Sequence, residues 1–102
     1  MTPYEVSIEK GAFNRHLTPA QRAFAETIIN CIAQSDDPFN YRDSNGAVKA
    51  LKYNRDGQYS YKPNTQLRNG YDLEIRIVFK PSKYRKLVII VIEVAPRELA
   101  YK

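Results

Sequence analysis

A run of eight residues, Leu87–Val94, constrains the fold more than any other segment of this chain. Seven of the eight are apolar and most are β-branched. A continuous run of this kind is typical of a strand that lies in the middle of a sheet and is covered on both faces. A second extended segment, Tyr71–Lys80, precedes it, and the basic connector Pro81–Lys86 joins the two. The sequence therefore predicts two neighbouring strands in the second half of the chain.

A helix is predicted in the first half from its capping residues. Thr18 is a typical N-cap, Pro19 occupies the first helical position, and Gln21 completes a capping box. These signals predict a helix over Pro19–Gln34. Its apolar stripe is expected to consist of Phe24, Ile28, Cys31 and Ile32, with Ala20 at its start, so Cys31 is expected in the core.

Several shorter elements follow from local patterns. Apolar and polar residues alternate over Pro3–Glu9, which predicts a strand. Phe13–Leu17 is expected to form a short helical turn. Ala47–Tyr53 and Gln58–Lys62 are predicted strands on either side of a turn at residues 55–57, and residues 63–70 are a predicted loop.

These elements together predict the fold class. Helical content comes early and strands come late, which is typical of an α+β protein. We expect one domain over residues 1–102, in which an N-terminal strand and a helix pack on a mainly antiparallel sheet of four to five strands.

Positive charge is concentrated in the second half of the chain. Residues 1–48 carry a formal charge of −2, whereas residues 49–102 carry +7. The strand-rich half therefore carries the positive field, which favours an anionic partner such as nucleic acid or an acidic protein. A basic surface that only keeps the protein in solution explains the charge alone equally well.

Composition argues against several other classes of protein. With 43% hydrophobic and 26% charged residues, the chain is typical of a globular domain. Its apolar runs are far shorter than the ~20 residues of a membrane span. No signal-peptide pattern is visible, so we expect a cytoplasmic protein without a membrane partner. One cysteine and one histidine cannot form a structural zinc site, and we expect no metal and no cofactor.

Short motifs in the last third of the chain resemble a known family. Asn69-Gly70-Tyr71 precedes the strand Arg76–Phe79, and the apolar strand is followed by Pro96-Arg97-Glu98. This order resembles the C-terminal half of the RelE/ParE toxin superfamily, most strongly over residues 69–98. The early strand, the helix and the lysines near position 50 occur in a compatible order. The resemblance implies a RelE/ParE-like fold and a place in a toxin–antitoxin pair.

The RelE branch of that superfamily implies a metal-independent endoribonuclease that cleaves mRNA, with the ribosome as a candidate partner. An acidic antitoxin protein is the implied inhibitor. In such a reaction a 2′-hydroxyl attacks the adjacent phosphorus, which requires a base, an acid and stabilisation of negative charge. Lysine, tyrosine and arginine would supply these groups, and arginine can only stabilise charge because it keeps its proton.

The resemblance also assigns individual residues. The expected catalytic residues are Arg76, Arg97, Lys49, Lys52 and Tyr101. Basic residues that interleave with tyrosines or lie in the connector are expected to bind nucleic acid, namely Arg55, Lys62, Arg68, Lys83, Arg85 and Lys86.

Plainer interpretations stay open at this point. Arg76 alternates with isoleucines, which would place it on the solvent face of a sheet. Lys49 and Lys52 point to opposite faces of a regular strand, which argues against a site with paired lysines. Two other functions are therefore retained: a ParE-like toxin that inhibits DNA gyrase without a nuclease site, and a non-catalytic basic domain that binds nucleic acid.

Overall fold

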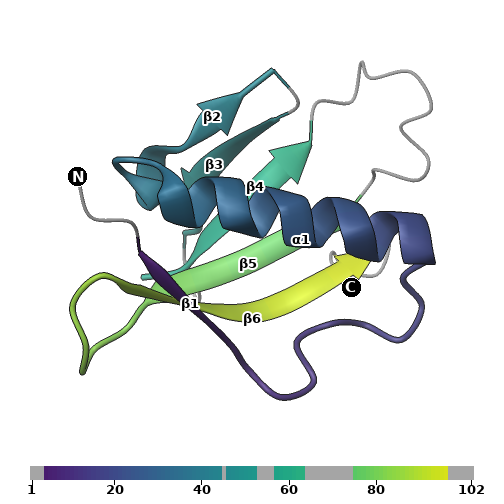
Figure 1. Cartoon of the computed structure of the whole chain (residues 1–102), viewed down its shortest axis with the longest axis horizontal. Helices are drawn as coiled ribbons and strands as arrows, with labels where there is room; N and C mark the ends of the chain where they lie inside the picture. The colour runs from purple at the N-terminus through teal and green to yellow at the C-terminus, as the bar shows by residue number, and fades with distance from the viewer. Residues whose placement is uncertain (1–3, 45, 53–56, 64–74, 97–102) are drawn as a thin grey trace.

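One helix packs across one face of a six-stranded sheet (Figure 1). The computed structural model describes residues 4–44, 46–52, 57–63 and 75–96. The elements, in chain order, are β1 (Glu5–Ile8), α1 (Pro19–Gln34), the 3₁₀ turn η1 (Pro38–Asn40), β2 (Arg42–Asp43), β3 (Gly46–Ala50), β4 (Tyr59–Pro63), β5 (Ile75–Pro81) and β6 (Val88–Pro96). The predicted α+β class is confirmed.

The strand order in the sheet is β1-β6-β5-β4-β3-β2. β1 runs parallel to β6, with Glu5 opposite Val88, and all the other neighbours are antiparallel. The described residues thus form six strands rather than the expected four to five. The two-residue strand β2 is too short to produce a periodic pattern, and the turn dipeptide Asn45-Gly46 is the one local signal of a hairpin there.

Helix α1 has the predicted bounds because its N-terminus is fully capped. The Thr18 hydroxyl accepts a 3.1 Å hydrogen bond from the Gln21 backbone N–H, and the Gln21 side chain accepts a 2.9 Å bond from the Thr18 N–H. These reciprocal bonds satisfy donors that the helix itself leaves unpaired.

Among the described residues, no helix combines the length and apolar character needed to cross a bilayer.

The buried stripe of α1 differs from the predicted one. Ala25, Ile28, Ile29 and Ile32 face the sheet, whereas Cys31 is exposed. The predicted core position of Cys31 is therefore wrong. Ala25 is small and fully buried, so the helix packs against the sheet on the side that carries this residue.

The predicted helical turn at Phe13–Leu17 is confirmed only for its second part. The Leu17 N–H donates to the Asn14 carbonyl at 3.2 Å and closes a turn there. Phe13 instead forms an isolated parallel bridge with Val94 of β6. The Val94 N–H donates to the Ala12 carbonyl at 2.7 Å, and the Asn14 N–H donates to the Val94 carbonyl at 2.8 Å. The start of the segment thus uses its backbone groups to extend the parallel pairing of β1.

The core lies between α1 and strands β3 to β6. Side chains of β5 alternate, so Ile75, Ile77 and Phe79 face the helix while Arg76 and Val78 face away from it. We call the face that points away from α1 the outer face. Strand β6 lies between β1 and β5, as its apolar run predicts, and each of its residues is buried or half-buried.

The predicted strand pair around residue 50 is confirmed with shifted ends. β3 and β4 pair antiparallel, with Val48 opposite Tyr61. β3 ends at Ala50, three residues earlier than predicted, and β4 begins at Tyr59. Gly57 adopts a left-handed conformation (φ 83°) in the connection between them, as a turn signal predicts.

Candidate nucleic-acid interface

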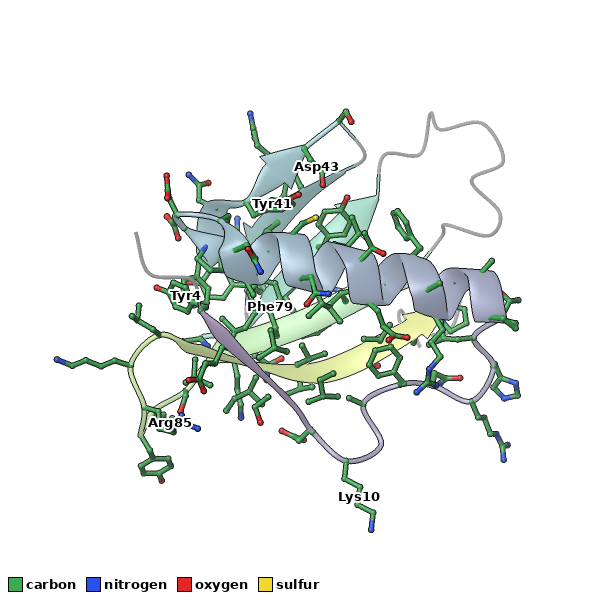
Figure 2. All side chains as sticks on the ribbon, viewed as in Figure 1. Tyr4, Lys10, Tyr41, Asp43, Phe79 and Arg85 are labelled. Atoms are coloured by element: carbon green, nitrogen blue, oxygen red, sulfur yellow. The ribbon has the colours of Figure 1, made fainter. Side chains whose placement is uncertain are left out.

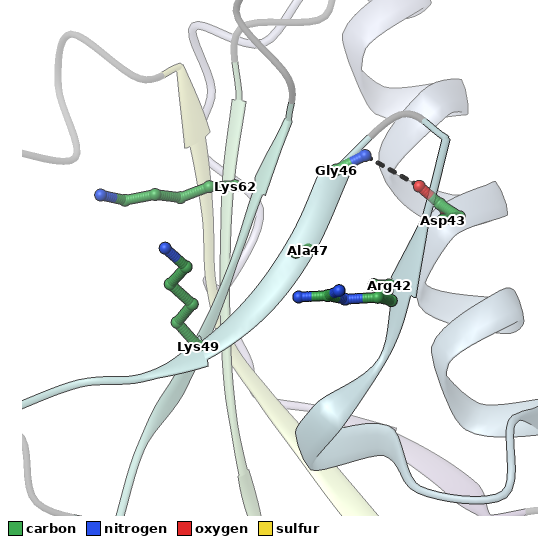
Figure 3. Close-up of a pocket in the computed structure, with 6 residues that line it drawn as sticks. All are labelled: Arg42, Asp43, Gly46, Ala47, Lys49 and Lys62. Carbon is green, nitrogen blue, oxygen red and sulfur yellow. Dashed lines mark hydrogen bonds between the residues drawn. The ribbon is translucent and has the colours of Figure 1, made fainter.

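The outer face of strands β2, β3 and β4 forms an open pocket of about 360 Å³ (Figure 3). We call it the cationic pocket, and its lining residues are Arg42, Asp43, Gly46, Ala47, Lys49 and Lys62. Three of these six residues are basic and one is acidic.

Strand register explains why the basic residues gather there. Arg42 lies opposite Ala47, and Ala47 lies opposite Lys62, so two cations flank one small residue across three strands. Adjacent strands are ~4.8 Å apart, which separates these two backbones by roughly 10 Å. Lys49 is two positions along β3 from Ala47 and points to the same face. Figure 3 shows the Arg42 side chain reaching over Ala47 while Lys49 and Lys62 extend on the same side.

The cations of the pocket are accessible to solvent. Arg42, Lys49 and Lys62 are all exposed. Within the described part of the chain, no carboxylate forms an ion pair with Arg42 or Lys49. A concave surface lined by exposed cations concentrates anions, and lysine and arginine both form charge-assisted hydrogen bonds to phosphate.

A hydrogen-bonded cluster holds β2 in place beside the pocket. The Tyr41 hydroxyl donates to Oδ2 of Asp43 at 2.6 Å, and the Tyr61 hydroxyl donates to Oδ1 at 3.1 Å. The Gly46 N–H also donates to Oδ1 at 2.8 Å. Figure 2 shows Tyr41 and Asp43 close together at this edge of the sheet. We call these four residues the Asp43 clamp. It joins β2 to β3 and β4 and so fixes the strand that carries Arg42.

The hydroxyls of both clamp tyrosines are weaker acids than an ordinary tyrosine hydroxyl. Burial raises the pKa of Tyr61, and the negative charge of Asp43 raises it further. Burial and the hydrogen bond to Asp43 raise the pKa of Tyr41 in the same way. Because a phenol with a raised pKa holds its proton more tightly, these residues have a structural role and are unsuited to general acid catalysis.

The clamp also requires glycine at position 46. A Cβ atom there would collide with the Lys62 carbonyl oxygen and would lie 2.7 Å from the Tyr61 hydroxyl. The backbone of β3 therefore approaches β4 more closely at Gly46 than any other residue type allows.

Arg76 lies on the outer face, as its alternation predicts, but it is buried. Only 9% of its surface is exposed, and its Nε donates to the Ser60 hydroxyl at 3.1 Å. The interpretation of Arg76 as a solvent-exposed residue is therefore wrong. The Ser60 bond is not its only interaction. A buried guanidinium with protein partners ties β5 to β4 and is poorly placed to clamp a substrate phosphate.

The structure separates the two candidate lysines. Lys49 lines the cationic pocket, whereas Lys52 lies beyond the end of β3 and is not among the lining residues. The expectation that Lys49 and Lys52 point to opposite faces assumes that both lie in one regular strand. It does not apply to Lys52, because β3 ends at Ala50.

A second group of cations lies on the turn between β5 and β6. Lys83, Arg85 and Lys86 are all exposed there. Arg85 forms an ion pair with Glu5 of β1, with 2.9 Å between Nη2 and Oε2. Figure 2 shows Arg85 at this turn, at the opposite edge of the view from Asp43. The protein therefore carries two separate groups of exposed cations, one in the cationic pocket and one on the turn between β5 and β6.

Four expected site residues lie outside the described residues, namely Arg55, Arg68, Arg97 and Tyr101. The motif Asn69-Gly70-Tyr71 lies outside them as well. The catalytic role that the resemblance gives to Arg97 stays a prediction.

No family model, curated protein or solved structure matches this chain.

Sequence reasoning missed Arg42 and the Asp43 clamp. Arg42 follows a polar segment without periodicity, so no local signal indicates that it faces Lys62 across β3. Asp43 meets Tyr61 from 18 positions away in the sequence, and only the paired strands bring them together. A turn signal at residues 45 and 46 was the single indication of a hairpin at this place.

Glu93 lies on the outer face, apart from Lys49. Lys49, Ser60, Val78 and Glu93 form one row across strands β3 to β6. Three strand spacings separate Lys49 from Glu93, which is roughly 14 Å. In the described ranges, no group of three or more His, Cys, Asp or Glu residues could hold a metal ion. The three exposed cations of the pocket are of the kind that attract an anion.

Proposed function

We propose that this chain is a RelE/ParE-like toxin that binds mRNA on the outer face of its sheet and cleaves it. The observation that best supports this function is the cationic pocket, where Arg42, Lys49 and Lys62 surround Ala47. These three cations come from three paired strands, so the sheet fixes their spacing before any ligand arrives. A preformed group of cations loses little conformational freedom when it binds a phosphate chain.

Binding is expected to be electrostatic and strongly dependent on salt. Each phosphate that a lysine or arginine neutralises releases counterions, and the logarithm of the affinity falls by about 0.7 per phosphate for each tenfold rise in salt with single-stranded nucleic acid. Each pocket cation that neutralises a phosphate would therefore add about 0.7 to the salt slope of binding. The exposed turn residues Lys83, Arg85 and Lys86 are proposed to add phosphate contacts that do not depend on sequence.

Cleavage is proposed to follow from attack of the 2′-hydroxyl on the neighbouring phosphorus, with departure of the 5′-oxygen. Arg42 is placed to stabilise the extra negative charge because its guanidinium stays protonated. Lys49 is a catalytic residue by the resemblance, and Lys62 is proposed to bind the phosphate beside it. From the resemblance, Arg97, Lys52 and Tyr101 are proposed to complete the catalytic group. The resemblance also implies an acidic antitoxin protein, which is proposed to cover the outer face of the sheet.

The direct test is induced expression combined with matched charge variants. The wild-type protein should stop protein synthesis and fragment mRNA. Arg42→Ala and Lys49→Ala should weaken both effects, whereas Lys10→Ala, which removes an exposed lysine away from the pocket, should not. Purified protein should give the same ranking for RNA binding. Full toxicity and full RNA binding in both pocket variants would refute the proposed site.

A second candidate function is binding without cleavage, as in a ParE-like inhibitor of DNA gyrase or a simple nucleic-acid-binding domain. Two observations favour it: Arg76 is buried against Ser60, and the phenols of Tyr41 and Tyr61 are engaged by Asp43. The expression experiment separates these functions. A gyrase inhibitor would cause DNA damage and filamentous growth with intact mRNA, and a binding domain would be tolerated by the cell.

A further inference from the structure

The turn between β5 and β6 exposes an aromatic ring among cations. Tyr84 is 94% exposed and Leu87 is 42% exposed, and they are two of the three large hydrophobic residues that the described part of the chain exposes. The exposed residues Lys83 and Lys86 stand on either side of Tyr84 and Arg85. An exposed ring with cations on both sides of it has the composition of a nucleic-acid contact, in which aromatic faces stack on bases and cations bind phosphates.

The backbone of this turn is fixed by specific bonds. The Ser82 hydroxyl accepts hydrogen bonds from the N–H groups of Tyr84 at 3.3 Å and Arg85 at 3.2 Å. The Ser82 N–H donates to the Val88 carbonyl at 3.0 Å, and Leu87 adopts a left-handed conformation (φ 58°). The ion pair between Arg85 and Glu5 attaches the turn to β1. The backbone that carries Tyr84 is therefore ordered, and the Tyr84 side chain is exposed to solvent.

We infer that Tyr84 is a stacking platform for an unpaired base, with Lys83 and Lys86 on the neighbouring phosphates, so that the ligand of this protein is single-stranded RNA. This inference rests on the proposed function and adds to it a site on the β5–β6 turn that contacts the bases. A tyrosine face stacks on any base, and flanking cations bind the phosphates that join successive bases. Bases inside a duplex already stack on each other and cannot use such a platform.

The place of the turn supports a strand-like ligand. Arg85 on the turn and Asp43 beside the cationic pocket lie at opposite edges of Figure 2. A ligand that used both areas would have to be extended and flexible, which describes a single strand better than a duplex or a small anion. Tyr84 would contact the bases while the pocket would contact phosphates only.

The test compares binding of two probes at equilibrium. One is a fluorescently labelled, unstructured RNA of mixed sequence with 2′-O-methyl groups, which cannot be cleaved by 2′-hydroxyl attack. The other is the same RNA annealed to its complement. The full chain and four variants, Tyr84→Ala, Tyr84→Phe, Lys83→Ala and Arg42→Ala, are titrated by fluorescence anisotropy at several salt concentrations.

We expect Tyr84→Ala to weaken single-strand binding by about 5- to 100-fold, the range expected for loss of one stacked base. Its salt dependence should stay unchanged, because no phosphate contact is removed. Tyr84→Phe keeps the ring and should bind within about twofold of wild type. Lys83→Ala should instead lower the salt slope by about 0.7. Duplex binding should be insensitive to Tyr84→Ala.

Other results would overturn the inference in distinguishable ways. If Tyr84→Ala binds single strands as tightly as wild type while Arg42→Ala does not, the platform is refuted and the proposed RNA binding stands. If wild type binds neither probe, both fail. If wild type binds vesicles that contain phosphatidylserine, and Tyr84→Ala abolishes that binding without affecting RNA, the turn is a membrane contact and the inference is wrong.

Discussion

The hydroxyl of Tyr41 donates a 2.6 Å hydrogen bond to Oδ2 of Asp43, two positions further along the chain. The other carboxylate oxygen accepts bonds from Tyr61 and from the Gly46 backbone. One carboxylate thus joins β2 to the two strands beside it, and Arg42 is the residue next to it. Through this connection, the stability of the sheet edge and the geometry of the cationic pocket depend on the same side chain.

Replacing the carboxylate should therefore weaken both properties. Asp43→Asn keeps the shape but turns one acceptor oxygen into a donor, so one of the three donors loses its partner. We expect a loss of about 2 kcal/mol in the free energy of unfolding, measured by urea denaturation. RNA binding at temperatures where the variant is folded should also fall. Asp36→Asn, at an exposed acidic residue beyond α1, is the control and should change neither. Equal stability of the two variants would contradict the role of the clamp.

The tyrosines of the clamp should make the protein sensitive to high pH. Their folded-state pKa values are raised above the ordinary value near 10, so the folded protein holds these protons more tightly than the unfolded chain does. The resulting stability is complete below pH ~10 and is lost as the pH rises beyond it, towards the folded-state values. Urea midpoints measured between pH 9 and pH 11 should fall less steeply in Tyr61→Phe than in wild type. Tyr84→Phe, at an exposed ring, should keep the wild-type slope.

Two glycines should respond differently to a methyl group. Gly46→Ala would drive its Cβ into the Lys62 carbonyl and the Tyr61 hydroxyl, so we expect a loss of about 1–3 kcal/mol and a weaker cationic pocket. Gly57 has no atom within 4 Å of such a Cβ, but its φ of 83° suits glycine. Gly57→Ala should therefore cost about 1 kcal/mol and leave RNA binding intact. Unchanged RNA binding in a folded Gly46→Ala protein would argue against the link between this position and the pocket.

Arg76 should behave as a structural residue. Arg76→Ala removes a buried guanidinium and leaves the Ser60 hydroxyl without this donor, so we expect a loss of about 2–4 kcal/mol in stability. Loss of toxicity in this variant would then reflect unfolding, and denaturation must be measured beside it. Ser60→Ala is the matched variant, and it should lose less because the guanidinium keeps its other interactions. A fully stable Arg76→Ala protein that is inactive would restore the catalytic interpretation.

The helix cap offers a test of local stability away from the pocket. Thr18→Ala removes the acceptor for the Gln21 N–H and should destabilise the protein by about 1 kcal/mol. Thr27 is an exposed threonine inside the same helix, where its hydroxyl bonds to the Ala23 carbonyl. Thr27→Ala should be neutral or slightly stabilising, because alanine is the better helix former. Equal losses in both variants would show that the cap contributes nothing special.

Local signals predicted the parts of this fold that depend on neighbouring residues. The bounds of α1 follow from Thr18 and Gln21, which meet within one helical turn. The position of β6 between β1 and β5 follows from its apolar run, because such a run has no polar face to give to water. These elements are fixed by interactions between residues a few positions apart, or by the composition of a single strand.

The remaining features depend on contacts that a sequence pattern does not contain. Alternation placed Arg76 on the outer face, but its burial depends on tertiary packing, which period two does not describe. The apolar stripe of α1 predicts that Cys31 faces the core, but the structure buries the side that carries Ala25. The rotation of a helix on a sheet depends on where small residues allow close approach, and the stripe alone does not contain this information. Arg42 joined the candidate site only through the register of three strands.

The parallel pairing of β1 with β6 has a consequence for synthesis of the protein. Glu5 finds its partner Val88 only after almost the whole described chain has left the ribosome. Until then, the first strand and the apolar face of α1 lack the surface on which they pack. Folding is therefore expected to finish after translation, in one late step, and contacts of such long sequence separation form slowly. A nascent chain that stops before β6 would expose these apolar surfaces and would be expected to bind chaperones.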